Sequence, residues 1–190
     1  MHRLLPLVAV LALSSCASAP KNTANTCAIF EQREGLFTNW RRDAERVSAE
    51  FGVPVPVLMA TIQAESNFDP KARPPRRWIL GFIPGKRASS AYGFAQALDG
   101  TWAEYQRRTG RFGARRDQFA DAVHFIGWYH ADSHRRTGID RTDAYSLYLA
   151  YHSGHAGYER EVWRNRPEAL RGARRARDMA ARYAAQLKRC

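Results

Sequence analysis

Apolar residues recur at helical spacing along most of the chain beyond about residue 37. Phe119, Ala122, Ile126 and Tyr129, for example, follow the three-to-four-residue period of one helix face. The same spacing predicts helices over residues 37–51, 55–67, 99–108, 117–134, 143–151 and 167–187. We find neither a convincing period-two stretch nor an internal repeat. The pattern therefore predicts an all-α domain of about six or seven helices around one core.

The second of these helices carries a carboxylate on its apolar face. Leu58, Ile62 and Glu65 fall at i, i+4 and i+7, so the stripe that faces the core ends in Glu65. Desolvation at such a position raises the pKa of a carboxyl group. A carboxyl that stays protonated near neutral pH is what a general acid requires. The position fits equally well a helix-end glutamate that turns to water.

Residues 71–90 form a long connection with several prolines and glycines. Loops of this length in a compact domain are often functional. The apolar residues Trp78, Ile79, Leu80 and Phe82 lie within it. Three roles are open for them: a lid over a cleft, a docking surface for a partner in an envelope machine, or packing onto the core.

The N-terminus has the features of an export signal. A basic residue, Arg3, precedes an apolar run from Leu4 to Leu13, and the run is too short to span a bilayer as a stable helix. Residues 13–16, Leu-Ser-Ser-Cys, resemble the bacterial lipobox. The resemblance implies cleavage after residue 15 and a lipid on Cys16, whereas the alternative is an ordinary signal with an incidental cysteine.

This interpretation divides the chain into a signal peptide (1–15), a lipidated cysteine with its tether (16–36) and a folded domain (37–190) whose last helix lies within 165–188. Because Asp does not follow Cys16, the resemblance to lipoproteins points to the outer membrane, with the domain on the periplasmic side.

Export also changes the interpretation of the other two cysteines. Cys27 and Cys190 stand at the two ends of the folded part, in an oxidising compartment where disulfides persist. A bridge between them would close nearly the whole domain and would stabilise it by roughly 4–5 kcal/mol in the loop-entropy model. Two unpaired cysteines are the alternative.

The chain is strongly basic, with a formal charge of +12 at pH 7 that becomes +11 once Arg3 leaves with the signal peptide. Basic patches often bind nucleic acid, but an exported lipoprotein meets anionic cell wall and lipid headgroups instead. We therefore expect no nucleic-acid partner. The positive charge does not distinguish among the remaining functions.

Three segments in order carry a family resemblance. Glu65-Ser66 ends the second helix, Gly93-Phe94-Ala95-Gln96 follows, and residues 150–154 read Ala-Tyr-His-Ser-Gly. Together they resemble the lytic transglycosylases of the soluble-transglycosylase type, whose motifs are ES, GLMQ and AYNxG. The resemblance runs from about residue 40 to about residue 158. The chain departs from the motifs at Phe94-Ala95 and at His152, and its loop after the first motif is longer than usual.

The resemblance implies a lysozyme-like, goose-type α fold with a central cleft. It also implies cleavage of the β-1,4 bond between N-acetylmuramic acid and N-acetylglucosamine in peptidoglycan, which leaves a 1,6-anhydro end, with Glu65 as the acid and then the base. Gly93 is expected to let the backbone approach the substrate, Ala95 to offer its main chain to a sugar, and Tyr151 to orient the Glu65 carboxyl. The residues expected to bind substrate are Ser66, Tyr92, Gly93, Phe94, Ala95, Gln96, Tyr151, His152 and, by stacking on a sugar, Trp78.

Other chemistries find less support in the sequence. A two-carboxylate glycosidase needs a second acid facing the bond, for which Asp69 and Asp99 are the nearest candidates. His130 and His134 are spaced i, i+4, but no further ligand motif accompanies them, so we expect no metal and no cofactor. The rival functions are a hydrolysing muramidase on the same fold and a non-catalytic peptidoglycan-binding scaffold.

Overall fold

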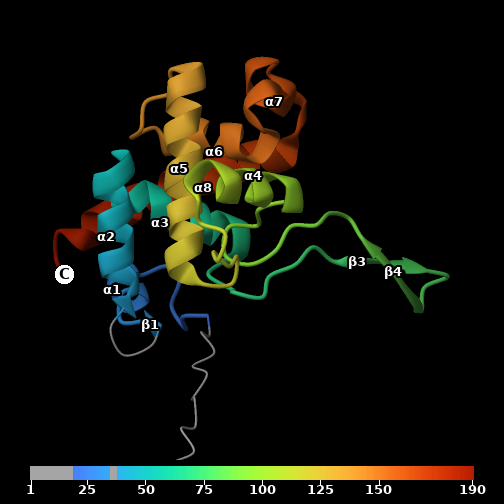
Figure 1. Ribbon diagram of the computed structural model, residues 1–190, viewed down its shortest axis with the longest axis horizontal. Coiled ribbons are helices and arrows are strands. Elements are labelled where there is room, and N and C mark those ends of the chain that lie inside the picture. Colours follow the sequence, from blue (N-terminus) through green and yellow to red (C-terminus); the bar gives the residue numbers. More distant parts are fainter. Residues whose placement is uncertain (1–18, 35–37) are drawn as a thin grey trace, which may run out of the picture.

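Helices form most of the chain in the computed structural model, which describes residues 19–34 and 38–190 (Figure 1). The signal peptide, Cys16 and part of the tether lie outside the described residues. The helices are α1 (Thr26–Ile29), α2 (Trp40–Phe51), α3 (Val55–Ser66), α4 (Asp99–Thr109), α5 (Phe119–Thr137), α6 (Ala144–Ser153), α7 (His155–Glu159), the 3-10 helix η1 (Val162–Asn165) and α8 (Pro167–Leu187). The short strands β1 (Arg33–Glu34) and β2 (Thr38–Asn39) form one antiparallel pair, and β3 (Arg76–Ile79) and β4 (Ile83–Arg87) form another.

The ends of the predicted helices follow from local chemistry. Asn39 caps α2 by accepting a hydrogen bond from the Arg42 N–H at 2.8 Å, and Gly52 ends that helix in the left-handed region at φ 69°. Asp143 caps α6 in the same way, through the N–H groups of Tyr145 and Ser146. Asp99 does not cap a helix: it is the first residue of α4 and pairs with Arg116 at 2.8 Å.

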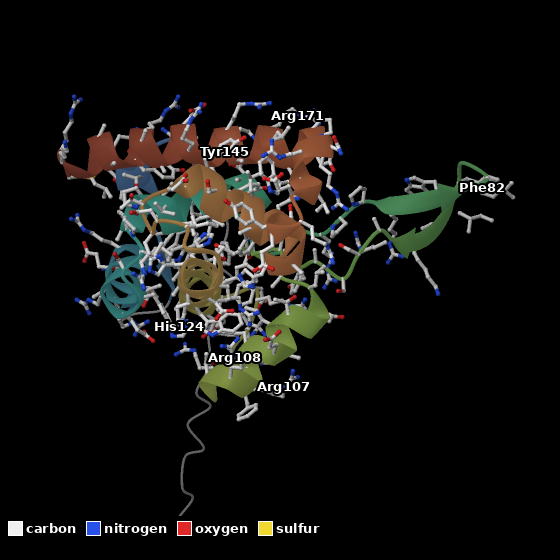
Figure 2. All side chains as sticks on the ribbon, turned by 90° about the horizontal axis from the view of Figure 1, so that it is seen from above. Phe82, Arg107, Arg108, His124, Tyr145 and Arg171 are labelled. Carbon is white, nitrogen blue, oxygen red and sulfur yellow. A yellow bond between two sulfur atoms is a disulfide. The ribbon has the colours of Figure 1, made fainter. Side chains whose placement is uncertain are left out.

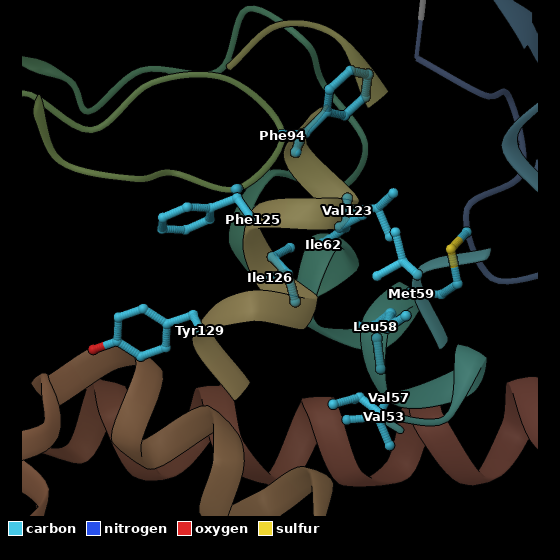
Figure 3. Packing of buried hydrophobic residues seen from close by; sticks show 14 of the residues in the cluster. Val53, Val57, Leu58, Met59, Ile62, Phe94, Val123, Phe125, Ile126 and Tyr129 are labelled. Atoms are coloured by element: carbon cyan, nitrogen blue, oxygen red, sulfur yellow. The ribbon is translucent and has the colours of Figure 1, made fainter. Parts of the chain in front are cut away.

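The core lies between α3 and α5 (Figure 3). Leu58 and Ile62 from α3 and Val123 and Ile126 from α5 are fully buried there, as the helical spacing predicts. Aromatic rings extend this core toward α2, where Trp40 stacks on other buried rings. Within the described residues no single helix is long and apolar enough to cross a bilayer; α2 and α3 together reach that length and composition, but they meet at 115°.

The two ends of the domain are joined. Cys27 and Cys190 form a disulfide with their Cα atoms 6.0 Å apart, across a separation of 163 residues. Gln186 of α8 strengthens the junction, because its side chain accepts from the Thr26 N–H at 2.9 Å and donates to the Ala24 carbonyl at 3.1 Å. The predicted pairing of the cysteines is therefore confirmed in the structure.

The connection 71–90 contains secondary structure that we did not predict. β3 and β4 form a hairpin with Trp78 opposite Pro84 and Ile79 opposite Ile83. The hairpin projects away from the helices, with Phe82 near its far end (Figures 1 and 2). Of the three roles left open for this segment, packing onto the core is wrong, because Trp78, Leu80 and Phe82 are 63%, 78% and 71% exposed.

Candidate active site

Glu65 stands in the last turn of α3 and is partly buried. Its Oε1 atom is fully buried and has no hydrogen-bond partner within the described protein. Burial raises the pKa of this carboxyl to about 7, against the smaller opposing effects of a hydrogen bond with Tyr148 and of the positive charge of Arg175. The carboxyl is thus poised between its acid and base forms near neutral pH.

Tyr151 lies near Glu65 as expected, but its hydroxyl does not bond the Glu65 carboxyl. Tyr151 lines the same cavity as Glu65, but its hydroxyl donates to the Ala95 carbonyl at 2.5 Å. Tyr148, one helical turn earlier on α6, makes the hydrogen bond that lowers the pKa of Glu65. The sequence contained a signal for it, since Tyr148 and Tyr151 are three residues apart and share one helix face.

The turn around residues 92–97 is built on a close approach between backbones. Gly93 has φ +75°, and a Cβ there would stand 2.6 Å from the Arg116 carbonyl carbon and closer still to its oxygen. That oxygen accepts from the Phe94 N–H at 3.1 Å. Glycine is therefore required at this position by the Arg116 backbone, a reason different from the expected approach to substrate.

Gln96 closes the turn in a conformation that is unusual for a residue with a side chain, at φ 49°. Its Nε2 atom donates to the carbonyls of Ala72 and Gly93, at 3.0 and 2.9 Å. The bond to Ala72 joins the turn to the segment that follows α3, and the bond to Gly93 closes the turn on itself. Gln96 thus stands with Glu65 in the walls of both cavities described below.

Phe94 and Ala95 are fully buried, so their side chains belong to the core rather than to a substrate cleft. Phe94 packs edge-on against Trp40 with ring centroids 5.3 Å apart. What Ala95 contributes is its carbonyl, the acceptor for Tyr151. The Phe-Ala pair that departs from the family motif thus fills the core behind the turn.

Tyr92 and Trp78 lie away from Glu65. The Arg73 guanidinium lies 4.0 Å from the centroid of the Tyr92 ring, and the Tyr92 hydroxyl donates to Asp117 at 3.3 Å. Trp78 stands on the hairpin in solvent. Neither is among the described residues that line the two cavities, although Arg73, which contacts Tyr92, lines the smaller one.

Two cavities meet at Glu65 and Gln96. The larger, of about 450 Å³, is also lined by Tyr151 and His152. The smaller, of about 400 Å³, is also lined by Ser66, Arg73 and Arg175. Glu65 is the one carboxylic acid among the described residues that line either cavity. The arrangement offers an extended ligand two binding regions with a single acid between them.

The other candidate acids and the histidines have their own partners. Asp69 accepts from the Lys71 N–H at 2.8 Å, and Asp99 pairs with Arg116. His130 is buried with its Nε2 atom 2.9 Å from the Thr61 hydroxyl, and burial lowers its pKa to about 3. Nδ1 of His134 lies 2.7 Å from the Ile139 carbonyl. In the part of the chain that the structure describes, no group of His, Cys, Asp and Glu side chains could hold a metal ion.

A comparison with protein families matches residues 4–190 to the family described as Transglycosylase SLT domain, whereas no curated protein matches the chain. The match covers nearly the whole chain, more than the 40–158 core that the motifs indicate. The members of this family are lytic transglycosylases that act on peptidoglycan, and the helical structure is consistent with their lysozyme-like fold. The chain belongs to the transglycosylase SLT domain family.

Proposed function

We propose that the chain is a murein lytic transglycosylase that cleaves the β-1,4 bond between N-acetylmuramic acid and N-acetylglucosamine, with Glu65 as acid and then base. One observation carries the proposal: among the described residues that line the two cavities Glu65 is the one carboxylic acid, and its pKa is about 7. A group with that pKa can give a proton and take one back at neutral pH.

In the first step the protonated Glu65 gives its proton to the glycosidic oxygen, and the bond from that oxygen to C1 of the muramoyl sugar breaks. The N-acetyl group of the substrate stabilises C1, which removes the need for a second protein carboxylate. In the second step the C6 hydroxyl attacks C1 and its proton goes to the Glu65 carboxylate. The product is a 1,6-anhydro ring, no water is consumed, and Glu65 regains its starting form.

The groups around Glu65 support both steps. Tyr148 holds the carboxylate by a hydrogen bond, and Arg175 favours its charged form. Gln96 and Tyr151 keep the turn of residues 92–97 against the site. His152 replaces the family asparagine in the wall of the larger cavity. Its pKa lies below the usual 6.5, mainly through desolvation, so at pH 7 it is neutral and offers one donor and one acceptor to a sugar.

We further propose that the domain is held by a lipid on Cys16 at the periplasmic face of the outer membrane. The lipobox-like residues 13–16 and the apolar run before them support this part of the proposal. The Cys27–Cys190 disulfide suits an oxidising compartment such as the periplasm.

Digestion of purified sacculi tests the function. The full chain, Glu65→Gln and the control Glu45→Gln are compared, and released muropeptides are identified by mass spectrometry. Glu45 is an exposed acid on α2 paired with Arg41. We expect 1,6-anhydro products from the chain and the control and none from Glu65→Gln. Products that carry an added water would identify a muramidase, and sacculus binding without any release would identify a scaffold.

A further inference from the structure

The β3–β4 hairpin has an apolar end that the proposed reaction does not use. Trp78, Leu80 and Phe82 are largely exposed, Ile83 is exposed as well, and none of them lines either cavity. Their exposure costs free energy in water, and contiguous exposed apolar surface commonly marks a site of interaction. The hairpin extends from the helical body (Figure 2), so its end is free to contact a separate surface.

Basic residues flank this apolar end on both strands. Arg76 lies opposite Arg87 in the backbone register of the hairpin, and Arg77 and Lys86 are their neighbours in the sequence. From Lys71 to Leu98 the chain has six basic residues and no acidic one. This part of the chain therefore combines a strong positive charge at the base of the hairpin with an apolar tip.

We propose that the hairpin inserts its tip into an anionic phospholipid surface. From Trp78 to the turn at Gly81 is three residues, or about 10 Å of strand, which matches the depth to which interfacial elements bury their apolar face, about 5–10 Å. The Arg76–Arg87 pair then lies at the level of the headgroups, where positive side chains are attracted to anionic lipids. Trp78, with an apolar ring and an N–H, suits the boundary between these layers.

The observations favour lipid over a protein partner of an envelope machine. A groove on a protein would need to fit particular side chains, whereas a bilayer needs only an apolar tip with cations behind it. The hairpin meets that simpler requirement, and the absence of acids from Lys71 to Leu98 removes the repulsion that anionic lipid would otherwise produce. This inference does not depend on the cleavage of peptidoglycan.

Tryptophan fluorescence tests the insertion. The full chain is mixed with vesicles of phosphatidylglycerol and phosphatidylcholine in equal parts, whose acyl chains carry bromine as a quencher. Trp40, Trp102 and Trp128 are buried, and Trp163 of η1 is partly buried. The segment before Trp40 holds no tryptophan, so its own insertion gives no signal. We expect bromine to quench about one fifth of the emission, because Trp78 is one of five tryptophans, and Trp78→Phe to abolish this quenching.

Matched variants distinguish binding through the hairpin tip from non-specific binding to lipid. The affinity is measured as the lipid concentration that gives half of the maximal quenching. Phe82→Ser removes an apolar side chain from the tip and should lower the affinity at least about tenfold. Phe112→Ser, at a ring equally exposed at 71% outside the hairpin, should leave it unchanged. Lys86→Gln should lower the affinity about fivefold, while Arg182→Gln on α8 removes the same charge without effect.

Two results would overturn the proposal while circular dichroism shows an intact helical fold. One is equal quenching in anionic vesicles and in pure phosphatidylcholine. The other is the absence of quenching in both kinds of vesicle. In that case, a crosslinker placed at Phe82 that captured a protein in cells would assign the tip to a protein partner. Because the assay contains no peptidoglycan, its outcome is independent of the sacculus digestion.

Discussion

The ring of Tyr148 occupies the space that a side chain on Gly172 would need. A Cβ at Gly172 of α8 would stand 2.7 Å from the Tyr148 hydroxyl oxygen and 2.8 Å from its Cζ atom, and both distances are too short for a van der Waals contact. The missing side chain lets Tyr148 of α6 lie between α8 and Glu65. The hydrogen bond between Tyr148 and the Glu65 carboxyl therefore depends on a glycine in a third helix.

Gly172→Ala should displace Tyr148 and weaken the site. Overpacking of this kind costs about 1–3 kcal/mol of the free energy of unfolding, and loss of a hydrogen bond to a charged group predicts a drop in kcat of about tenfold or more. Gly100→Ala is the matched control, because a Cβ there meets nothing within 4 Å. Urea unfolding and the rate of muropeptide release measure the two effects; a Gly172→Ala protein as active as the Gly100→Ala protein would contradict the prediction.

Replacement of each tyrosine by phenylalanine should separate their roles. Glu65 must be protonated to act as the acid, so kcat/KM should fall as the pH rises through about 7. The hydrogen bond with Tyr148 lowers the pKa of Glu65, so Tyr148→Phe should move this fall to higher pH. Tyr151→Phe removes the bond to the Ala95 carbonyl and should reduce the rate without moving the profile. Profiles that shift equally in both variants would refute this division of roles.

The sequence predicted the helices and the position of Glu65 better than it predicted which side chains surround Glu65. Burial imposes a helical period on Leu58 and Ile62. That period put Glu65 at the end of the buried stripe, and the resemblance of Glu65-Ser66 to the family motif then identified it as the acid. The choice between Tyr148 and Tyr151 depends on how α6 meets α3 and α8, which local spacing does not encode. The motif match placed Phe94 in the site, but its aromatic side chain packs into the core.

The hairpin was missed for a related physical reason. A strand with one face on the core alternates apolar and polar residues, but β3 and β4 pack against no other described strand or sheet, and the side chains of Trp78, Leu80 and Phe82 lie in solvent. No burial pattern was therefore imposed on their residues. Export signals act before folding, and those at residues 1–16 lie outside the described residues, so the fold does not test them.

Glu65→Gln should be inactive and, at high pH, more stable than the parent chain. Burial raises the pKa of Glu65 from 4.5 to about 7, so between these values the folded state binds a proton that the unfolded state has lost. Stability must then fall as the pH rises from 4.5 to about 7. Glutamine does not titrate, so the variant escapes this loss, which amounts to about 1–3 kcal/mol above pH 7.

Urea unfolding of both proteins at pH 4.5 and pH 8 measures this difference. It should be near zero at the lower pH and favour Glu65→Gln at the higher one. Glu45→Gln, at an exposed acid, should show no such gain. A gain that was the same at both pH values would mean that the carboxyl is not desolvated.

Reduction of the Cys27–Cys190 disulfide should destabilise the whole domain. The bond spans 163 residues, and a loop of that length predicts a loss of about 5 kcal/mol from the free energy of unfolding on loop entropy alone. Gln186 remains bonded to Thr26 and Ala24 after reduction, so the folded state keeps the same contacts and the loss arises mainly in the unfolded chain. Urea unfolding with and without dithiothreitol measures it. The Cys27→Ser/Cys190→Ser variant should match the reduced protein and be indifferent to the reductant, and a sensitivity that persisted in this variant would assign the effect to something other than the bridge.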